Sequence, residues 1–166
     1  SKAHCVQVAH QAGKILKRLG YSEHEIELAK IAGYMHDIGN AINRTHHAEY
    51  GALLANDLLK ETDMSLEDRI TVIAAIGNHD ESTGSPEDVV SAALIIADKT
   101  DVRRSRVRPK EQSAFDIHDR VNYAVTDSKL KIAKDKSVIA LNLQIDENIC
   151  SMYDYFEIFL ERMMLC

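Results

Sequence analysis

The sequence predicts a mainly α-helical fold with a small α+β extension at its carboxyl end. Apolar residues recur every three or four positions through five segments before residue 102, which is the spacing of one face of an α-helix. Farther along, two β-branched and partly alternating runs flank a turn-like KDK tripeptide, a pattern typical of a hairpin. We therefore expect a bundle of about five core helices in residues 1–105 and an α+β extension in residues 106–166.

Three helices are expected before residue 60. Apolar positions follow helical spacing through residues 3–19, which predicts the first helix. Ser22 and Glu25 then form a capping-box pattern at the start of a second helix, which continues to His36. A polar connection precedes the third helix, which carries the small and apolar residues of the segment 51–59.

Two further helices complete the predicted bundle. Ser65 and Asp68 mark the start of the fourth helix, and Gly77 lies near its end. The tract ESTGSPED is a loop by composition, and it separates the fourth helix from the segment 89–101. That segment is apolar nearly all round, so we expect it at the centre of the bundle.

The predicted extension combines helices and strands. A basic run ends at a proline and leads into a mixed, helix-like segment near residues 115–123. The hairpin is expected over about residues 129–145, and apolar periodicity predicts a terminal helix over about 149–166.

Composition narrows the class of protein. A chain of 166 residues with 45% hydrophobic residues is typical of one globular domain with an appendage. No apolar run approaches the ~18 residues that cross a bilayer, and no signal-peptide pattern begins the chain. Three cysteines without CxxC spacing favour a reducing cytoplasm. The net charge of −6 argues against a general nucleic-acid binder, so we expect neither nucleic acid nor membrane as a partner.

Histidines and aspartates extend the apolar faces of four predicted helices. These residues are His4, His36, Asp37, His79 and Asp98, and most lie three or four positions from an apolar residue of the same helix. Imidazole and carboxylate groups that point into one core need a common partner. A divalent transition metal such as Fe, Mn, Co or Zn suits these ligands and offsets the cost of burying the carboxylates.

The adjacent His36 and Asp37 could serve two ions. Successive side chains on a helix point about 100° apart, so His36 could bind one ion while Asp37 bridges to a second. His79, with either His46 or His47, would then complete the second ion, giving two metals ~4 Å apart that clamp a phosphoryl group.

A competing interpretation treats each histidine as a hydrogen-bonded core residue. A single histidine at such a position is more often structural than a metal ligand. Independent core histidines, however, have no reason to lie beside Asp37 and Asp98. The joint pattern therefore favours a metal site.

These residues also carry a resemblance to a known family. His4, the His-Asp pair within HDIGN, and Asp98 within IIADK resemble the H…HD…D signature of the HD-domain superfamily of metal-dependent phosphohydrolases. The segment HAEYGA resembles the His-x-x-x-Gly-Ala segment of its two-metal members, which include bacterial symmetrical dinucleoside-tetraphosphate hydrolases. The segment AIGNHDE resembles the one that supplies their next histidine. The resemblance covers about residues 1–105 and implies an HD-domain-like helical bundle.

The resemblance implies a ligand set for one or two ions. The first ion would be bound by four side chains, those of His4, His36, Asp37 and Asp98. The second would share Asp37, the implied catalytic residue, with His47 and His79, while His46 would be a substitute or supporting group.

The sequence departs from the family in places that bear on the substrate. Asn40 stands where the cyclic-di-GMP phosphodiesterase branch usually has lysine, the triplet Asn78-His79-Asp80 replaces His-His-Glu, and a Gly-Tyr-Pro motif is absent from the sequence. These differences argue against that substrate. The DKTDVRRSRVR stretch also differs from the tetraphosphate hydrolases, so a dinucleoside tetraphosphate is one candidate among several.

A phosphorylated substrate would need positive charge near the site. Arg44 precedes His47, and Lys99, Arg103 and Arg104 follow Asp98 closely. Their alternative interpretation is a solvated basic face. A local basic mouth on an acidic protein suits a small anionic ligand, such as a nucleotide, better than a duplex.

Three functions fit these observations. The first is hydrolysis of a phosphoester or phosphoanhydride, expected to be that of a nucleotide, by a metal-activated water. The second is oxidation by O₂ at a di-iron pair, which some HD-domain relatives carry. The third is a non-catalytic module for nucleotide sensing or regulation, in which the hairpin and terminal helix could form a homodimer surface.

Overall fold

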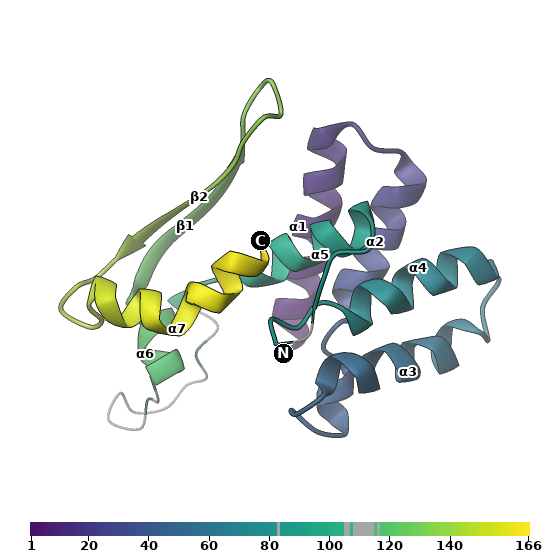
Figure 1. Cartoon of the computed structure of the whole chain (residues 1–166), viewed down its shortest axis with the longest axis horizontal. Helices are drawn as coiled ribbons and strands as arrows, with labels where there is room; N and C mark the ends of the chain where they lie inside the picture. Colours follow the sequence, from purple (N-terminus) through teal and green to yellow (C-terminus); the bar gives the residue numbers. More distant parts are fainter. Residues whose placement is uncertain (83, 105–106, 108–114, 116) are drawn as a thin grey trace. The chain divides into compact units, whose positions relative to one another are not determined.

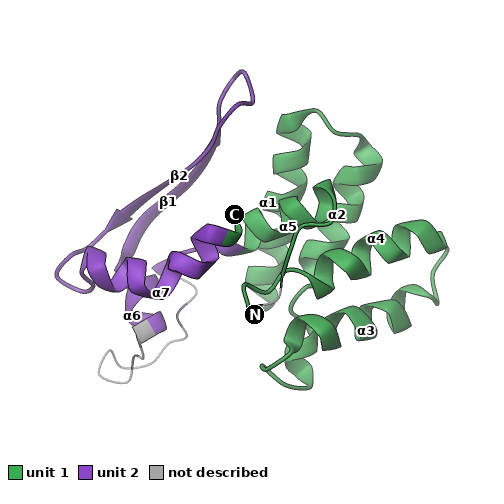
Figure 2. Ribbon diagram, in the orientation of Figure 1, with its two compact units in different colours: residues 1–98, 165–166 green, residues 99–164 purple. Residues whose placement is uncertain are grey.

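The chain folds into two compact units in a computed structural model that describes residues 1–82, 84–104, 107, 115 and 117–166 (Figure 1). Unit 1 comprises residues 1–98 with residues 165–166, and unit 2 comprises residues 99–164 (Figure 2). Unit 1 is a helical bundle, and unit 2 combines helices with one two-stranded antiparallel sheet. The predicted fold class, mainly α with a small α+β appendage, is confirmed.

Unit 1 begins with two helices that pack closely, α1 (Lys2–Leu19) and α2 (Glu23–Met35). The predicted capping box is confirmed, because the Ser22 side chain accepts a hydrogen bond from the Glu25 amide and Glu25 accepts one from the Ser22 amide. Gly33 allows the close approach, since a Cβ there would lie 2.7 Å from the Ala9 Cα. This contact fixes the first turns of α1 against the last turn of α2.

Three more α-helices and one 3-10 helix complete the bundle of unit 1. The 3-10 helix η1 (Ile38–Ala41) packs against α3 (His47–Leu59), and α4 (Leu66–Gly77) packs against both α2 and α3. The predicted central helix is α5 (Val89–Lys99), in which no residue is exposed and most apolar side chains are buried. Its lack of a polar face follows from that burial.

Unit 2 contains two helices and a hairpin, namely α6 (Ile117–Ala124), β1 (Val125–Ile132), β2 (Ile139–Ile145) and α7 (Met152–Leu165). The strands pair antiparallel with Leu130 opposite Leu141, and an irregularity lies between Val125 and Asp127. Leu143 and Ile145 of β2 pack against a buried apolar cluster. That cluster consists of Val102, Val121, Ala124, Val125, Cys150, Tyr155 and Phe159.

The hairpin begins four residues earlier than the sequence pattern indicates, at Val125 rather than near Lys129. The segment 126–129 is polar and carries no alternation, so periodicity gives no strand signal there. The strand forms because Val125, which is buried, pairs with Ile145. Tertiary packing therefore extends the strand into a segment without local preference.

No helix in the described ranges is long and apolar enough to span a membrane.

Candidate metal centre

Histidine and aspartate side chains from five parts of unit 1 converge on one buried cluster. Two groups of three have ligand atoms that all lie within 4.8 Å of one another, a distance that would allow a shared ion. The first group is His4, His36 and Asp98, and the second is His36, Asp37 and His79. The structure thus brings together five residues that the sequence places up to 94 positions apart, from His4 to Asp98.

Apart from one contact of 3.1 Å between His4 and Asp98, the distances between histidine nitrogens and carboxylate oxygens in the cluster are longer than ordinary hydrogen bonds. Nε2 of His4 lies 3.1 Å from Oδ1 of Asp98 and 3.9 Å from Oδ2 of Asp37. Nε2 of His36 lies 3.6 Å from Oδ1 of Asp98 and 3.8 Å from Oδ1 of Asp37. Both histidines therefore face both carboxylates.

The imidazole rings form a row. The ring centroids are 5.1 Å apart between His4 and His36, 5.0 Å between His36 and His79, and 5.0 Å between His79 and His47, each pair edge to face. Asp37 lies alongside this row, because its Oδ1 is also 3.9 Å from Nε2 of His47. His47 thus extends the cluster beyond the two groups of three.

The two central residues of the cluster, His36 and Asp37, are positioned by the end of a helix rather than by its interior. Helix α2 ends at Met35, so His36 caps it and Asp37 lies in the following turn with φ −91° and ψ 4°. His36 and Asp37 therefore lie at the end of α2 and in the turn that follows it, rather than within one continuous helix. The turn into η1 is tight, because a Cβ on Gly39 would overlap the backbone of α3. The 100° angle expected between the two side chains stays a prediction.

Backbone carbonyls fix the orientation of three of the imidazoles. Nδ1 of His36 donates to the Gly33 carbonyl at 2.7 Å, and Nδ1 of His79 donates to the Ile76 carbonyl at 2.6 Å. Nδ1 of His47 lies 3.1 Å from the Arg44 carbonyl in the same arrangement. A carbonyl can only accept, so in the neutral ring the proton is on Nδ1 and the lone pair is on Nε2. This is the usual arrangement of metal-binding histidines.

The surroundings of one buried nitrogen atom indicate whether a metal ion would fit among these residues. Nε2 of His36 is buried and has no hydrogen-bond partner in the part of the chain that the structure describes. It faces carboxylate oxygens of Asp37 and Asp98, so lone pairs point at lone pairs. A cation between them would turn this repulsion into coordination, and His/Asp sets suit divalent transition ions. The residues present therefore fit a metal.

Electrostatics keep Asp37 ionised. Burial favours its neutral form and Asp98 repels its charge, but the positive charge that His36, His4 and His79 carry when they are protonated outweighs both, so without a metal the pKa of Asp37 lies below its usual range. Cys5 behaves oppositely, because burial and the nearby Asp37 raise the pKa of its thiol. Cys5 is therefore a protonated thiol beside the site rather than a thiolate ligand.

Asn40 holds the central carboxylate, a role that the sequence analysis does not assign to it. Its side-chain amide donates to Oδ1 of Asp37 at 2.8 Å and to the Asp37 carbonyl at 3.1 Å. The i, i+3 spacing of Asp37 and Asn40 across a tight turn is a usable signal for such a contact.

The two adjacent histidines face different surroundings. His47 is the first residue of α3 and directs Nε2 toward Asp37. His46 precedes the helix with φ 61°, a left-handed conformation uncommon outside glycine, and its exposed ring lies 3.4 Å from the Glu49 carboxylate. Of the two, His47 is the one that adjoins the cluster.

The predicted cationic residues lie in different places. Arg44 lines a pocket beside His47, and Lys99 is buried at the end of α5. Within unit 2, Arg103 pairs with Asp101, and Arg104 donates to the Tyr123 carbonyl at 2.6 Å while it covers the Tyr123 ring. Substrate binding by these residues stays a prediction.

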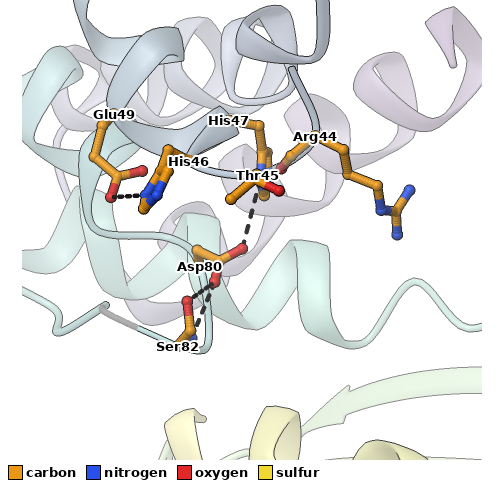
Figure 3. Close-up of a pocket in the computed structure, with 7 residues that line it drawn as sticks. All are labelled: Arg44, Thr45, His46, His47, Glu49, Asp80 and Ser82. Atoms are coloured by element: carbon orange, nitrogen blue, oxygen red, sulfur yellow. Dashed lines mark hydrogen bonds and ion pairs between the residues drawn. The ribbon is translucent and has the colours of Figure 1, made fainter.

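The pocket beside His47 has a volume of about 210 Å³ and is lined by Arg44, Thr45, His46, His47, Glu49, Asp80 and Ser82 (Figure 3). The pocket and the cluster share His47. Nε2 of His47 lies 3.9 Å from Oδ1 of Asp37 in the cluster, and its Nδ1 lies 3.6 Å from Oδ2 of Asp80 in the pocket. Glu49, Asp80 and Ser82 are not among the site residues that the sequence predicts. The acidic residues two positions after His47 and directly after His79 are the only sequence signal for them.

Comparisons with known proteins identify the family to which this chain is similar. The profile of the HD domain matches residues 2–120. An uncharacterized protein of Methanocaldococcus jannaschii is 27% identical over 160 residues, which cover 82% of this chain and 61% of that protein. No solved structure gives a significant match.

Ribonuclease Y proteins are further relatives. The one from Aster yellows witches'-broom phytoplasma is 33% identical over 108 residues, covering 63% of this chain and 18% of that protein. The one from Campylobacter jejuni subsp. doylei is 34% identical over 116 residues, covering 68% of this chain and 20% of that protein. The aligned part is thus about three fifths of the M. jannaschii protein and about a fifth of the ribonucleases.

Proposed function

Because the chain belongs to the HD-domain family, we propose that it is a metal-dependent phosphohydrolase that cleaves a phosphoester or phosphoanhydride of a nucleotide. The observation that carries this proposal is the buried Nε2 of His36, which faces two carboxylates and has no hydrogen-bond partner among the described residues. A buried arrangement of that kind is costly without a cation. The family and the ligand set therefore support the same chemistry.

Two ions are proposed, which could be Fe, Mn, Co or Zn. His4, His36, Asp37 and Asp98 would hold the first, and Asp37, His47 and His79 would hold the second. When bound, such ions lower the pKa of a water molecule and offset the charge that develops on a phosphoryl group.

Asp37 is the proposed link between the two sets of ligands. Its Oδ1 faces Nε2 of both His36 and His47, while its Oδ2 faces Nε2 of His4. The carboxylate is ionised and is held in place by Asn40. Substitution of Asp37 should therefore disturb both sets at once.

The substrate is proposed from charge and from the relatives. Arg44 offers a guanidinium fork that matches phosphate oxygens, and its side chain has no ion pair within the described residues. The ribonuclease Y relatives support a phosphodiester between ribonucleotides as a candidate bond. The net charge of −6 supports a small or single-stranded substrate over a duplex.

The test is turnover with added metals. Protein purified without chelator is analysed for metal content and assayed with bis(4-nitrophenyl) phosphate, nucleoside monophosphates, a dinucleoside tetraphosphate and a short single-stranded RNA. We expect phosphate-ester cleavage that depends on a transition ion and stops with a chelator. Asp37→Ala should lose both metal and turnover. Asp57→Ala, at an exposed aspartate of α3, should retain both.

Other outcomes identify other functions. Oxygen consumption without phosphate release would favour the di-iron oxygenase, and nucleotide binding without turnover would favour a sensing module. Absence of any metal after reconstitution would contradict the proposed function in all its forms.

A further inference from the structure

A second polar site lies next to the proposed metal centre. The pocket of about 210 Å³ contains two carboxylates, that of Glu49 beside His46 and that of Asp80 beside His47 (Figure 3). Oε1 of Glu49 lies 3.4 Å from Nδ1 of His46, and no described residue hydrogen-bonds to Oε2 of Glu49. Oδ1 of Asp80 accepts hydrogen bonds from the Ser82 amide at 3.0 Å and from its hydroxyl at 2.6 Å.

The chemistry of the pocket favours a neutral ligand rich in hydroxyl groups. Two carboxylates in so small a space repel a phosphate. Carboxylates accept hydrogen bonds from hydroxyl groups, and the acidic residue that contacts a ribose hydroxyl in dinucleotide-binding folds works in this way. A sugar ring is therefore a better ligand for this pocket than a phosphate group.

The size of the pocket points the same way. At roughly 30 Å³ per water molecule it holds about seven waters. Sites for whole small molecules are usually larger, at about 300–1,000 Å³. The pocket is thus of a size that suits one sugar ring, and the rest of a nucleotide would extend beyond it.

The neighbours of the pocket indicate where the rest of the ligand would lie. His47 is shared with the metal cluster, which would bind a phosphate. Arg44 lies at the end away from Glu49, and its guanidinium is turned outward from both carboxylates (Figure 3). A sugar in the pocket would thus have a phosphate-binding cluster on one side and a cationic group at its rim.

We propose that this pocket binds the ribose of a ribonucleotide, with Glu49 and Asp80 accepting hydrogen bonds from the 2′ and 3′ hydroxyls. The assignment rests on the proposed function, because it places the phosphate at the His/Asp cluster. It adds a preference for ribonucleotides over deoxyribonucleotides and assigns that preference to Glu49, which would accept from the 2′ hydroxyl, while Asp80 would accept from the 3′ hydroxyl that both kinds of nucleotide carry.

The test compares paired substrates that differ in one hydroxyl. The 4-nitrophenyl esters of uridine 5′-phosphate and 2′-deoxyuridine 5′-phosphate are assayed for kcat/KM with the metal-loaded protein. We expect a ribo-to-deoxyribo ratio of about tenfold or more, as is usual when a hydrogen bond to a charged group is lost. The ratio should fall toward one in Glu49→Ala, which removes a half-exposed side chain from the first turn of α3.

Matched variants separate the subsite from general damage. Glu61→Ala removes an exposed glutamate just after α3, outside the pocket, and should keep the wild-type ratio. Asp80→Asn should lower kcat/KM for both esters and leave their ratio high, because both carry the 3′ hydroxyl, provided that circular dichroism shows a native fold. A ratio near one in the wild type, or a high ratio unchanged in Glu49→Ala, would overturn the assignment.

Failure of the subsite and failure of the proposed function give different results. Cleavage of bis(4-nitrophenyl) phosphate, which has no sugar, reports the proposed function alone. If no ester is cleaved, calorimetric titration with uridine 5′-phosphate and its 2′-deoxy analogue still tests the pocket. Equal affinities for the two nucleotides would refute the ribose subsite without reference to turnover.

Discussion

The two units differ in what they bury. Unit 1 buries His4, His36, His79 and Asp98 together, whereas the buried cluster of unit 2 around Tyr155 and Phe159 is apolar, and the buried Lys99 and Asp101 of that unit lie outside it. Unit 2 also leaves apolar side chains exposed along α7, at Tyr153, Phe156, Leu160, Met163 and Met164. Buried ionisable groups cost stability and need a partner, while buried apolar groups stabilise by themselves. The convergence of histidines and aspartates is therefore a feature of unit 1, where we propose the metal centre.

The largest effect on stability is expected in the apolar cluster of unit 2. Phe159→Ala removes a ring that is 1% exposed, so it should cost ~3–5 kcal/mol of unfolding free energy. Phe156→Ala, on the 45% exposed ring of the same helix, should cost much less. Denaturant titration followed by circular dichroism measures both, and equal costs would mean that α7 does not pack as described. Metal content in native buffer should stay at the wild-type value in both variants.

A glycine in unit 1 should link stability to metal content. A Cβ on Gly39 would overlap the His47 carbonyl oxygen and the Gly51 backbone nitrogen, so Gly39→Ala should cost ~3 kcal/mol and displace His47. Gly77→Ala is the control, because its Cβ would make only an ordinary 3.5 Å contact with Ala52. Thermal unfolding and elemental analysis together test this. Normal stability and full metal content in Gly39→Ala would contradict the described contact between η1 and α3.

A smaller effect is expected at Asn40, which supports a ligand without being one. Asn40→Ala removes the hydrogen bond to Oδ1 of Asp37 and should weaken metal binding by about 10–100-fold. The folding transition of the metal-free protein should barely move, since Asn40 is exposed. Asn142→Ala, at an exposed position of β2 in unit 2, provides the comparison. Competition with a chelator gives the affinities, and equal values would remove Asn40 from the site.

The smallest effect is a pH dependence at the surface of unit 1. Hydrogen bonds from His24 and Ser65 lower the pKa of Asp68 below its usual value. A lowered carboxyl pKa gives stability that is present above the unfolded value of about 3.9 and is lost as pH falls through the folded value. Asp68→Asn should therefore be slightly less stable than wild type at pH 5 to 6, and the difference should shrink as the pH falls below the unfolded value of about 3.9. A difference that stayed constant as the solution was acidified would contradict this origin.

Periodicity and capping were sufficient for most of the helical fold. The capping box of Ser22 and Glu25, and the uninterrupted apolar segment that forms α5, are local signals with a direct physical cause. The start of the hairpin was not predictable in this way. Val125 enters the sheet through its burial and its pairing with Ile145, which are contacts between distant parts of the chain.

The amino-acid sequence alone determined the family signature and the residue types of the cluster, because His4, the HD pair, His79 and Asp98 are recognisable by kind and order. Only the tertiary structure decided how they meet. The helix ends at Met35 and Gly77 turn histidines onto backbone carbonyls, and the close packing at Gly39 brings α3 to Asp37. The pocket with Glu49 and Asp80 arises in the same way, since spacing along the chain does not specify the distance between side chains that only folding brings together.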